Sequence, residues 1–368
     1  LTLFAQALEE LKTDKQYTPH VLAITGTNGK TTVTSLTGQL LERAGLRIAV
    51  AGNIGPTLLD TLGCAIDQEQ SQWPQAWVLE LSSFQLDQVD NFEPTAATVL
   101  NLTQDHLDWH GYMAAYAKAK AGIFGRQASI VLNRDDSNVM AMLPAPVAKT
   151  KGSKQPPREV MRFGADMPTQ HGDWGLETVN GMTWLVRALN VDETRKSRAS
   201  TETEIYIQRL LPVDALRIRG RHNALNAMAA LALASSTGAP LASMLYALRE
   251  YRGEPHRVAS IAVLQDIEYI DDSKGTNVGA TVAAINSVGA DRQIVLILGG
   301  DGKDQDFSSL RVPIQQYVRS LVLIGKDAAQ LRQVLQGAGV PMHDAASLED
   351  AVKLCRSLAQ TGDAVLLS

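Results

Sequence analysis

The chain has 368 residues, with 34 lysines and arginines against 39 aspartates and glutamates, so its formal net charge is −5. That balance offers no basic surface for nucleic acid or for an anionic membrane, and no apolar run is long enough to span one. Hydrophobic residues make up 45% and charged residues 20% of the chain, which is ordinary for a water-soluble globular protein of two or three domains. The two cysteines, Cys64 and Cys355, lack zinc or redox spacing, so we expect reduced thiols in a cytoplasmic protein.

The two ends of the sequence suggest a fragment. The chain starts without a methionine, inside a helical pattern of apolar residues at Phe4, Leu8 and Leu11, and it stops directly after the apolar run 364–367. Ligands of α/β sheets lie beyond the carboxyl ends of the strands. We therefore expect a functional loop beyond Ser368.

The most informative motif is Thr-Gly-Thr-Asn-Gly-Lys-Thr-Thr at residues 25–32. The apolar run 21–24 predicts a buried parallel strand before it, and apolar residues at helical spacing predict a helix from 33 to 44. This order is typical of a phosphate loop, in which backbone N–H groups bind phosphates, Lys30 reaches the terminal phosphate and the Thr31 hydroxyl binds Mg²⁺. Because one glycine of the strict pattern is absent, an ordinary turn with a surface lysine is the alternative. The predicted nucleotide contacts are Gly26, Thr27, Asn28, Gly29, Lys30, Thr31 and Thr32.

The next two predicted strands each lead to a candidate polar group. The strand at 47–51 runs into a Gly-Asn-Ile-Gly turn at 52–55, where glycines let a ligand approach the backbone near Asn53, although a plain turn is equally compatible. The strand at 77–81 contains Glu80. A buried carboxylate without a cation is unfavourable, so we expect Mg²⁺ beside the phosphates as its partner. The alternative is that this glutamate lies at the exposed end of the strand.

A further strand and helix add an acid–histidine pair and a lysine. Asp105 and His106 follow the predicted strand 97–102, at the edge of the sheet where ligands bind. A lone histidine is usually structural, but this pairing at that edge favours a site. The predicted helix 112–124 places Lys120 on its apolar side. Its ammonium group either extends past the apolar surface to water or is buried with a lowered pKa.

The second half of the sequence changes pattern twice. Short alternating runs between 156 and 213 predict antiparallel hairpins, and an alanine-rich helix follows at 220–236. Asn223 and Asn226 lie on one face of its first turn, which favours a contact beyond helix capping. After a boundary near 249–253, strands, charged loops and helices alternate to the end of the chain.

The predicted fold is therefore α/β. Residues 1–251 would form a central phosphate-loop ATPase domain with a mostly parallel sheet and a small antiparallel region. Residues 252–368 would form a Rossmann-like, doubly wound domain.

Five motifs occur in an order typical of one enzyme family. They are Gly-Thr-Asn-Gly-Lys-Thr-Thr at 26–32, Glu-Leu-Ser-Ser-Phe-Gln-Leu at 80–86, Asp-His-Leu-Asp at 105–108, His-Asn-Ala-Leu-Asn at 222–226 and Pro-His-Arg at 255–257. Over nearly its whole length the chain resembles the ATP-dependent Mur ligases of peptidoglycan synthesis. Two more motifs, Asp-Ser-Lys-Gly-Thr-Asn at 272–277 and Gly-Gly-Asp-Gly-Lys at 299–303, resemble the members that add D-glutamate.

The resemblance implies the ligands and the domain roles. Residues 1–251 would be the central ATP-binding domain and 252–368 the amino-acid-binding domain, truncated at its end, while an N-terminal UDP-binding domain would be missing. ATP and two Mg²⁺ ions would be required. Thr31 and Glu80 would hold one ion, and His106 and a Lys120 carbamylated by CO₂ would hold the other. UDP-N-acetylmuramoyl-L-alanine and D-glutamate would be the substrates of a monomeric enzyme with no nucleic-acid partner and no membrane insertion.

The resemblance also assigns the remaining site residues. The catalytic residues would be Lys30, His106, Lys120 and Lys274. The nucleotide would further contact Asn226, Arg257 and Asp272. The substrates would contact Asn53, Ser82, Lys274, Thr276 and Lys303.

These residue types suit amide-bond formation through an acyl phosphate, since ATP must first activate a carboxylate before an amine attacks it. Two alternatives stay open. One is a ligase of the same superfamily that adds a different amino acid, or glutamate to a folate. The other is a nucleotide-binding regulatory module without ligase chemistry.

Overall fold

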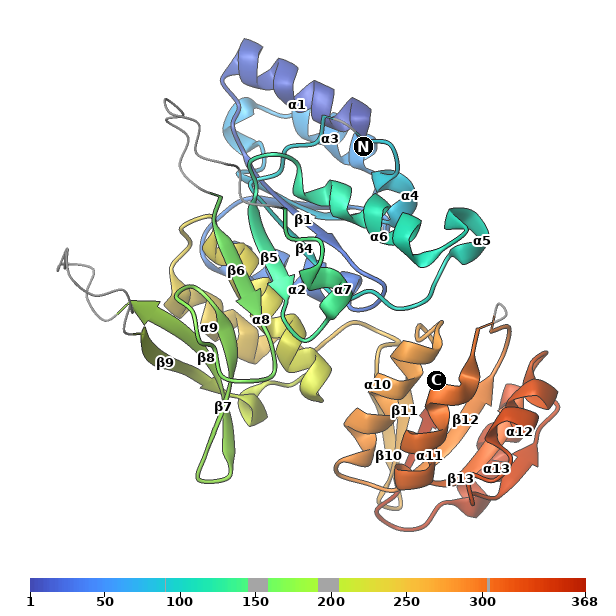
Figure 1. Cartoon of the computed structure of the whole chain (residues 1–368). Helices are drawn as coiled ribbons and strands as arrows, with labels where there is room; N and C mark the ends of the chain where they lie inside the picture. Colours follow the sequence, from blue (N-terminus) through green and yellow to red (C-terminus); the bar gives the residue numbers. More distant parts are fainter. Residues whose placement is uncertain (90, 145–157, 191–204, 303–304) are drawn as a thin grey trace. The chain divides into compact units, whose positions relative to one another are not determined.

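In the computed structural model, the described residues are 1–89, 91–144, 158–190, 205–302 and 305–368. They form two compact units (Figure 1). The first unit consists of Leu1–Arg217 and Ala224–Tyr251, and the second of Ile218–Asn223 and Arg252–Ser368. The grouping of the short segment Ile218–Asn223 with the second unit is not predictable from the sequence pattern. The functional roles of the two domains remain predictions.

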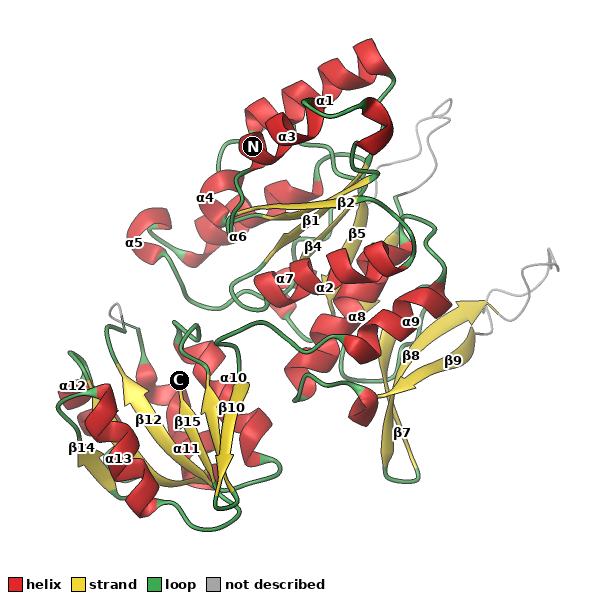
Figure 2. Cartoon of the chain, turned by 180° about the vertical axis from the view of Figure 1, so that it is seen from behind, coloured by secondary structure: helices red, strands yellow, loops and turns green. Residues whose placement is uncertain are grey.

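A nine-stranded sheet in the order β2-β3-β1-β4-β5-β6-β7-β8-β9 organises the first unit (Figure 2). Neighbouring strands from β2 to β7 run parallel, whereas β7, β8 and β9 pair antiparallel. The mostly parallel sheet with a small antiparallel region is thereby confirmed. The strands are β1 (His20–Thr25), β2 (Ile48–Gly52), β3 (Ala76–Glu80), β4 (Ala96–Val99), β5 (Ser129–Asn133), β6 (Val160–Phe163), β7 (Trp174–Val179), β8 (Met182–Asn190) and β9 (Ile205–Pro212).

Helices cover both faces of the parallel part of this sheet (Figure 1). One face packs against α1, α3, α4 and α6, whose buried side chains share a core with alternate residues of β1, β3 and β4. The other face carries α2, α8 and α9. The helices are α1 (Thr2–Lys15), α2 (Lys30–Arg43), α3 (Leu58–Ile66), α4 (Ser83–Leu86), α5 (Leu107–His110), α6 (Met113–Ala121), α7 (Ser137–Met140), α8 (Arg221–Ser235) and α9 (Leu241–Glu250), with 3-10 turns η1 (Gln70–Gln72), η2 (Gly122–Phe124) and η3 (Val213–Ala215).

The double cover explains why the central strands are apolar throughout. Ala23 points into the core beneath α1 and α3, and its neighbours Leu22 and Ile24 are equally buried. A parallel strand with helices on both sides has no solvent face, so it needs no alternation of polar residues. Side chains at the carboxyl ends of these strands are consequently the first that can reach a ligand.

The second unit has a six-stranded sheet in the order β10-β11-β15-β12-β13-β14. The strands β10 and β11 pair antiparallel, and the other neighbouring strands of this sheet run parallel. Helices α10, α11 and α12 share a core with one face, while α13 covers the other. Its elements are β10 (Ala259–Leu264), β11 (Ile267–Asp271), α10 (Val278–Gly289), β12 (Ile294–Gly299), η4 (Phe307–Leu310), α11 (Arg311–Tyr317), β13 (Val318–Ile324), α12 (Ala328–Leu335), β14 (Met342–Asp344), α13 (Leu348–Leu358) and β15 (Ala364–Leu367). Strands and helices alternate as predicted for a doubly wound domain.

Both cysteines are free thiols, Cys64 exposed and Cys355 buried. Among the described residues, no helix combines the length and apolar character that crossing a membrane requires.

Phe4 is the side chain of α1 that is buried most deeply against the sheet. Phe4 is fully buried, and its ring lies edge-on to that of Trp77, with the centroids 5.1 Å apart. Phe4→Ala should therefore lower the free energy of unfolding of the first unit by about 3–5 kcal/mol. Urea unfolding followed by tryptophan fluorescence measures this change. Leu3→Ala is the control, because Leu3 is 62% exposed on the same helix. Equal urea midpoints for the two variants would contradict this anchoring.

Candidate active site

The segment between β1 and α2 forms a loop that is fixed to the end of β4. Asn28 donates its backbone N–H to Asn101 Oδ1 at 2.8 Å, and Asn101 Nδ2 donates to the Asn28 carbonyl at 3.0 Å. The Thr27 hydroxyl donates to the Thr103 carbonyl and accepts the Thr103 N–H. The loop conformation is thus set by a neighbouring strand end as well as by its own sequence.

Gly29 is required at the point where the loop turns into α2. It is the N-cap of α2 with a left-handed φ of 83°, and a Cβ there would lie 2.7 Å from Asn226 Oδ1. The loop therefore packs against the first turns of α8. Thr31 and Thr32 follow in the first turn of α2, and both are buried. Strand, glycine turn and helix N-terminus are the arrangement that presents backbone N–H groups to a phosphate.

Two lysines converge on one backbone oxygen of this loop. Lys30 Nζ donates to the carbonyls of Gly26 and Thr27, both at 2.9 Å, and Lys120 Nζ donates to the same Gly26 carbonyl at 3.0 Å and to Thr25 Oγ1 at 3.2 Å. The two nitrogens are therefore no more than about 6 Å apart, a separation at which two ammonium groups repel each other by about 3 kcal/mol at an effective dielectric near 20. The pair favours one neutral amine.

Lys120 is the member of that pair whose charged form is disfavoured by its surroundings. Burial, followed by the positive charge of Lys30, lowers the pKa of the Lys120 amine well below 10.5, while Asp105 opposes this shift. Its side chain is 1% exposed, so the extended, solvent-reaching alternative for this lysine is wrong. Tyr116 flanks it, with the ring centroid 4.7 Å from Nζ and the hydroxyl 3.2 Å from Thr27 Oγ1. A buried neutral amine is a nucleophile.

Glu80 is a buried carboxylate with one uncompensated oxygen. The residue is 1% exposed, which excludes the exposed strand end as an alternative. Its Oε1 accepts a hydrogen bond from Asn53 Nδ2 at 3.0 Å, whereas none of the described residues donates a hydrogen bond to the buried Oε2. Gly52 allows the backbones of the two strand ends to lie close together, because a Cβ there would lie 2.1 Å from the Glu80 carbonyl oxygen. A cation could compensate such an oxygen.

His106 and Ser82 lie on short segments beyond β4 and β3. His106 adopts a left-handed φ of 52°, its Nε2 is 3.5 Å from Asp105 Oδ2, and its ring centroid is 4.8 Å from that of Phe84. Ser82 closes a capping box, in which its hydroxyl accepts the Gln85 N–H and the Gln85 side chain accepts the Ser82 N–H. Capping accounts for Ser82 structurally, so a substrate contact there stays a prediction.

In the second unit, the predicted residues gather at the loop after β11. Asp272 is buried, and its carboxylate accepts the Val258 N–H at 3.1 Å and the Ser368 hydroxyl at 2.9 Å. Burial raises the pKa of Asp272 to about 6, although these hydrogen bonds and the positive charge of Arg257 oppose the shift. Lys274 is exposed. Lys303 lies outside the described residues.

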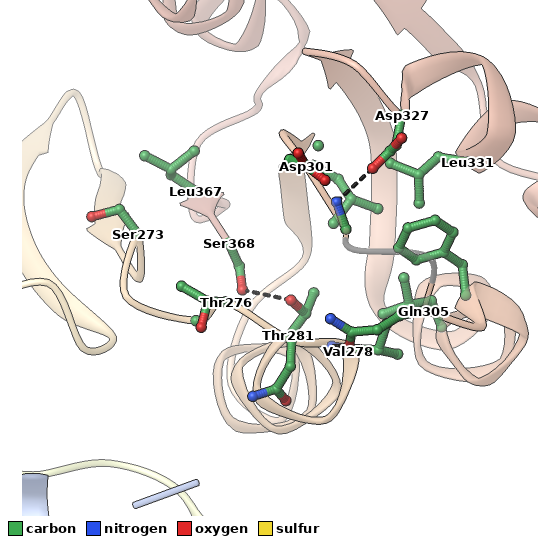
Figure 3. Close-up of a pocket in the computed structure, with 17 residues that line it drawn as sticks. Ser273, Thr276, Val278, Thr281, Asp301, Gln305, Asp327, Leu331, Leu367 and Ser368 are labelled. Atoms are coloured by element: carbon green, nitrogen blue, oxygen red, sulfur yellow. Dashed lines mark hydrogen bonds between the residues drawn. The ribbon is translucent and has the colours of Figure 1, made fainter. Parts of the chain in front are cut away.

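A pocket of about 310 Å³ opens beside the same loop (Figure 3). Thr276 lines it together with the N-terminus of α10, the loop after β12 and the last two residues of the chain. Lys274 is not among its lining residues, so the structure brings Thr276 but not Lys274 to this pocket.

Several site-forming residues escape sequence reasoning. Asn101, Thr103 and Tyr116 hold the phosphate loop and the buried lysine, yet each looks like an ordinary strand-end or helix residue. The only available signal is an asparagine directly after an apolar strand, which is also a common turn residue.

The sequence matches two family profiles and is similar to named ligases. The profile of the "Mur ligase middle domain" matches residues 24–234, and that of the "Mur ligase, glutamate ligase domain" matches residues 256–368. The chain is 59% identical over 368 residues to the UDP-N-acetylmuramoylalanine–D-glutamate ligase of Albidiferax ferrireducens, covering all of this chain and 72% of that protein. It is 63% identical over 354 residues to the protein of the same name from Polaromonas, covering 96% of this chain and 60% of that protein.

A solved structure agrees with the fold. The UDP-N-acetylmuramate-alanine ligase of Thermotoga maritima matches with a TM-score of 0.64 at 20% identity, covering 99% of this chain and 74% of that one. At this identity the similarity concerns the fold alone.

The raised pKa of Asp272 predicts a pH-dependent contribution to stability. An aspartate whose pKa is about 6 when folded and 3.8 in the reference state stabilises the fold in its protonated form. That contribution is complete below pH 3.8 and is lost as the pH rises through 6. Asp272→Asn should therefore raise the urea midpoint at pH 7.5, and the gain should shrink toward pH 4. Asp291→Asn, at an exposed aspartate, is the control and should show no such trend. An increase in the urea midpoint that does not depend on pH would contradict the raised pKa of Asp272.

Proposed function

The chain belongs to the Mur ligase family, and we propose that it catalyses the ATP-dependent addition of D-glutamate to UDP-N-acetylmuramoyl-L-alanine in peptidoglycan precursor synthesis. The observation that carries this proposal is the 59% identity, over the whole chain, to a protein named for that reaction. The phosphate loop with its two lysines, and the buried carboxylate beside it, are the groups that such chemistry needs.

The reaction must overcome the poor reactivity of a carboxylate. The alanine carboxylate attacks the γ-phosphorus of ATP, which breaks the bond to ADP and forms an acyl phosphate. The amine of D-glutamate then attacks the acyl carbon, and the amide forms as inorganic phosphate and a proton leave. We assign Lys30 and the backbone of residues 26–32 to the phosphates, where their positive charge and N–H groups neutralise the charge that develops during transfer.

The oxygen atoms at this site are of the kind that binds Mg²⁺. Glu80 Oε2 is buried and has no hydrogen-bond partner within the part of the chain that the structure describes, and a carboxylate oxygen is a preferred ligand of this ion. Within the described ranges, no three His, Cys, Asp or Glu side chains are grouped to hold a metal. Each of two ions would therefore take part of its coordination from phosphates, with Thr31 and Glu80 contributing to one and His106 and a modified Lys120 to the other. Bound Mg²⁺ would polarise the phosphoryl oxygens.

The modification follows from the chemistry of Lys120. Its neutral amine can add to CO₂, forming a carbamate and releasing one proton, so the side chain changes from a possible +1 charge to −1. An anion at that position would suit a second metal, whereas an ammonium group would repel it.

The remaining substrate contacts are assigned by motif. Asn226, Arg257 and Asp272 would bind the nucleotide, and Asn53 and Ser82 the muramoyl substrate. Lys274, Thr276 and Lys303 would bind D-glutamate, whose two carboxylates suit lysine side chains. We further propose a monomeric, cytoplasmic enzyme.

Phosphate release tests the function directly. The full-length protein that contains this chain should release phosphate from Mg-ATP only when UDP-N-acetylmuramoyl-L-alanine and D-glutamate are both present, and Lys30→Ala should abolish the release. L-glutamate and diamino acids are the competing acceptors. Release with one of them would keep the ligase mechanism but change the substrate. ATP binding without release for any acceptor would support a regulatory module.

Chemical rescue tests the carbamate. Lys120→Ala should lose nearly all turnover, and short carboxylic acids should restore part of it because they can replace the missing anion. Lys118→Ala, at an exposed position on the same helix, should remain active. Failure of rescue while two Mg²⁺ ions still bind would contradict a carbamylated Lys120.

A further inference from the structure

Two aromatic rings lie exposed at the rim of the phosphate-loop site. Phe84 is 43% and Trp109 64% exposed, and the rings meet edge to face with centroids 5.3 Å apart. We call these two rings the aromatic platform. Neither ring contributes to the core of the first unit. Adjacent exposed aromatic rings beside a polar site are typical of a ligand-binding surface.

The surrounding structure fixes the Phe84 ring. This residue sits in the first turn of α4, which the Ser82 capping box closes. The imidazole of His110 stacks on the ring at 5.9 Å with an interplanar angle of 10°, and its Nε2 lies 3.0 Å from Ser83 Oγ. His106 contacts the ring edge to face at 4.8 Å. The ring is therefore held in place, although almost half of it faces solvent.

Trp109 is held on the single turn α5. The Gly111 N–H donates to the Leu107 carbonyl at 2.8 Å, and Gly111 ends the turn with a left-handed φ of 77°. The indole contacts Phe84 but leaves most of its surface open. A rigid aromatic ring offers a large contact area at a low cost in conformational entropy.

We propose that the aromatic platform binds the pyranose ring of the muramoyl substrate by stacking against its apolar C–H face. This inference rests on the proposed function. In that substrate the reacting carboxylate is joined to the sugar through one alanine and one lactyl unit, a span of about 7 Å when extended. The sugar must therefore lie close to the metal that His106 would hold.

The platform lies within this reach. Phe84 is in direct contact with His106, and Trp109 is one ring further out. Of the other exposed aromatic residues, Tyr112 lies beside the platform, between α5 and α6, whereas Tyr206 and Tyr246 are remote. Tyr206 lies on β9 at the far end of the sheet, and Tyr246 lies on α9, on the opposite face. The sugar is the part of the substrate that lies within about 7 Å of the reacting carboxylate. The uridine lies further away, because the diphosphate separates it from the sugar.

Binding measurements on the full-length protein test the platform independently of turnover. Trp109→Ala should weaken the binding of UDP-N-acetylmuramoyl-L-alanine by about tenfold in calorimetry, in the presence of Mg²⁺ and a non-hydrolysable ATP analogue. The same loss should occur with 1-phospho-N-acetylmuramoyl-L-alanine, which keeps the sugar and lacks uridine. Trp109→Phe should recover most of the affinity. Tyr206→Ala is the matched control and should bind like the wild type.

Each other outcome overturns the platform. Unchanged affinity in Trp109→Ala, or no binding of the sugar compounds to the wild type, excludes the sugar contact. A loss confined to the UDP compound assigns Trp109 to uracil, and a loss of affinity for the ATP analogue assigns it to the nucleotide. A lowered melting temperature with unchanged affinity makes the ring structural. Failure of the proposed function would appear separately, as an absence of D-glutamate-dependent phosphate release by the wild type.

Discussion

The Gly26 carbonyl oxygen accepts hydrogen bonds from two lysines, and this shared contact determines the electrostatics of the site. Lys30 comes from the first turn of α2 and Lys120 from the buried side of α6. Because two ammonium groups this close repel each other, and because Lys120 has almost no access to water, its amine is driven toward the neutral form. Under the proposed function, one of the two would therefore remain a cation for phosphate, and the other would become available for covalent chemistry.

A buried negative charge that lacks a partner among the described residues lies at the end of β3, in contrast to the two positive groups at the loop. Glu80 is buried with one oxygen that no described group satisfies. A cation would compensate that oxygen, whereas a carbamate would make Lys120 an anion that needs a cation as well. Under the proposed function, nucleotide phosphates, Mg²⁺ and CO₂ would thus correct the same local imbalance. The protein keeps the site rigid through Asn101 and Thr103, which fix the loop before any ligand arrives.

The parts of the site whose structure follows from local sequence patterns could be predicted from the sequence. The strand–glycine–helix order placed Lys30 and Thr31 in a loop and helix start that the structure confirms. The helical spacing from 112 to 124 placed Lys120 on the apolar side of its helix but left open whether its amine reaches water, and only the structure shows that it is buried. Contacts between distant segments could not be predicted this way. The bond between Asn28 and Asn101 joins two loops, and the contact of Phe84 with Trp109 joins two single-turn helices. The three-residue strand β14 cannot be predicted this way either, because its Met-His-Asp sequence has no strand pattern.

The second unit shows how backbone strain is held at a site. His256 and Val258 both have left-handed φ values, 64° and 50°. Such a conformation typically costs about 1–3 kcal/mol of strain, and it is especially unfavourable for a β-branched residue such as Val258. Two neighbouring carboxylates oppose that cost, since Asp271 Oδ2 lies 2.6 Å from His256 Nδ1 and Asp272 accepts the Val258 N–H. Arg257 lies between the two strained residues, so its position is set by both carboxylates. A change at either aspartate would therefore alter the backbone that carries Arg257, and a change at Asp272 would also remove a charge that interacts with its guanidinium group.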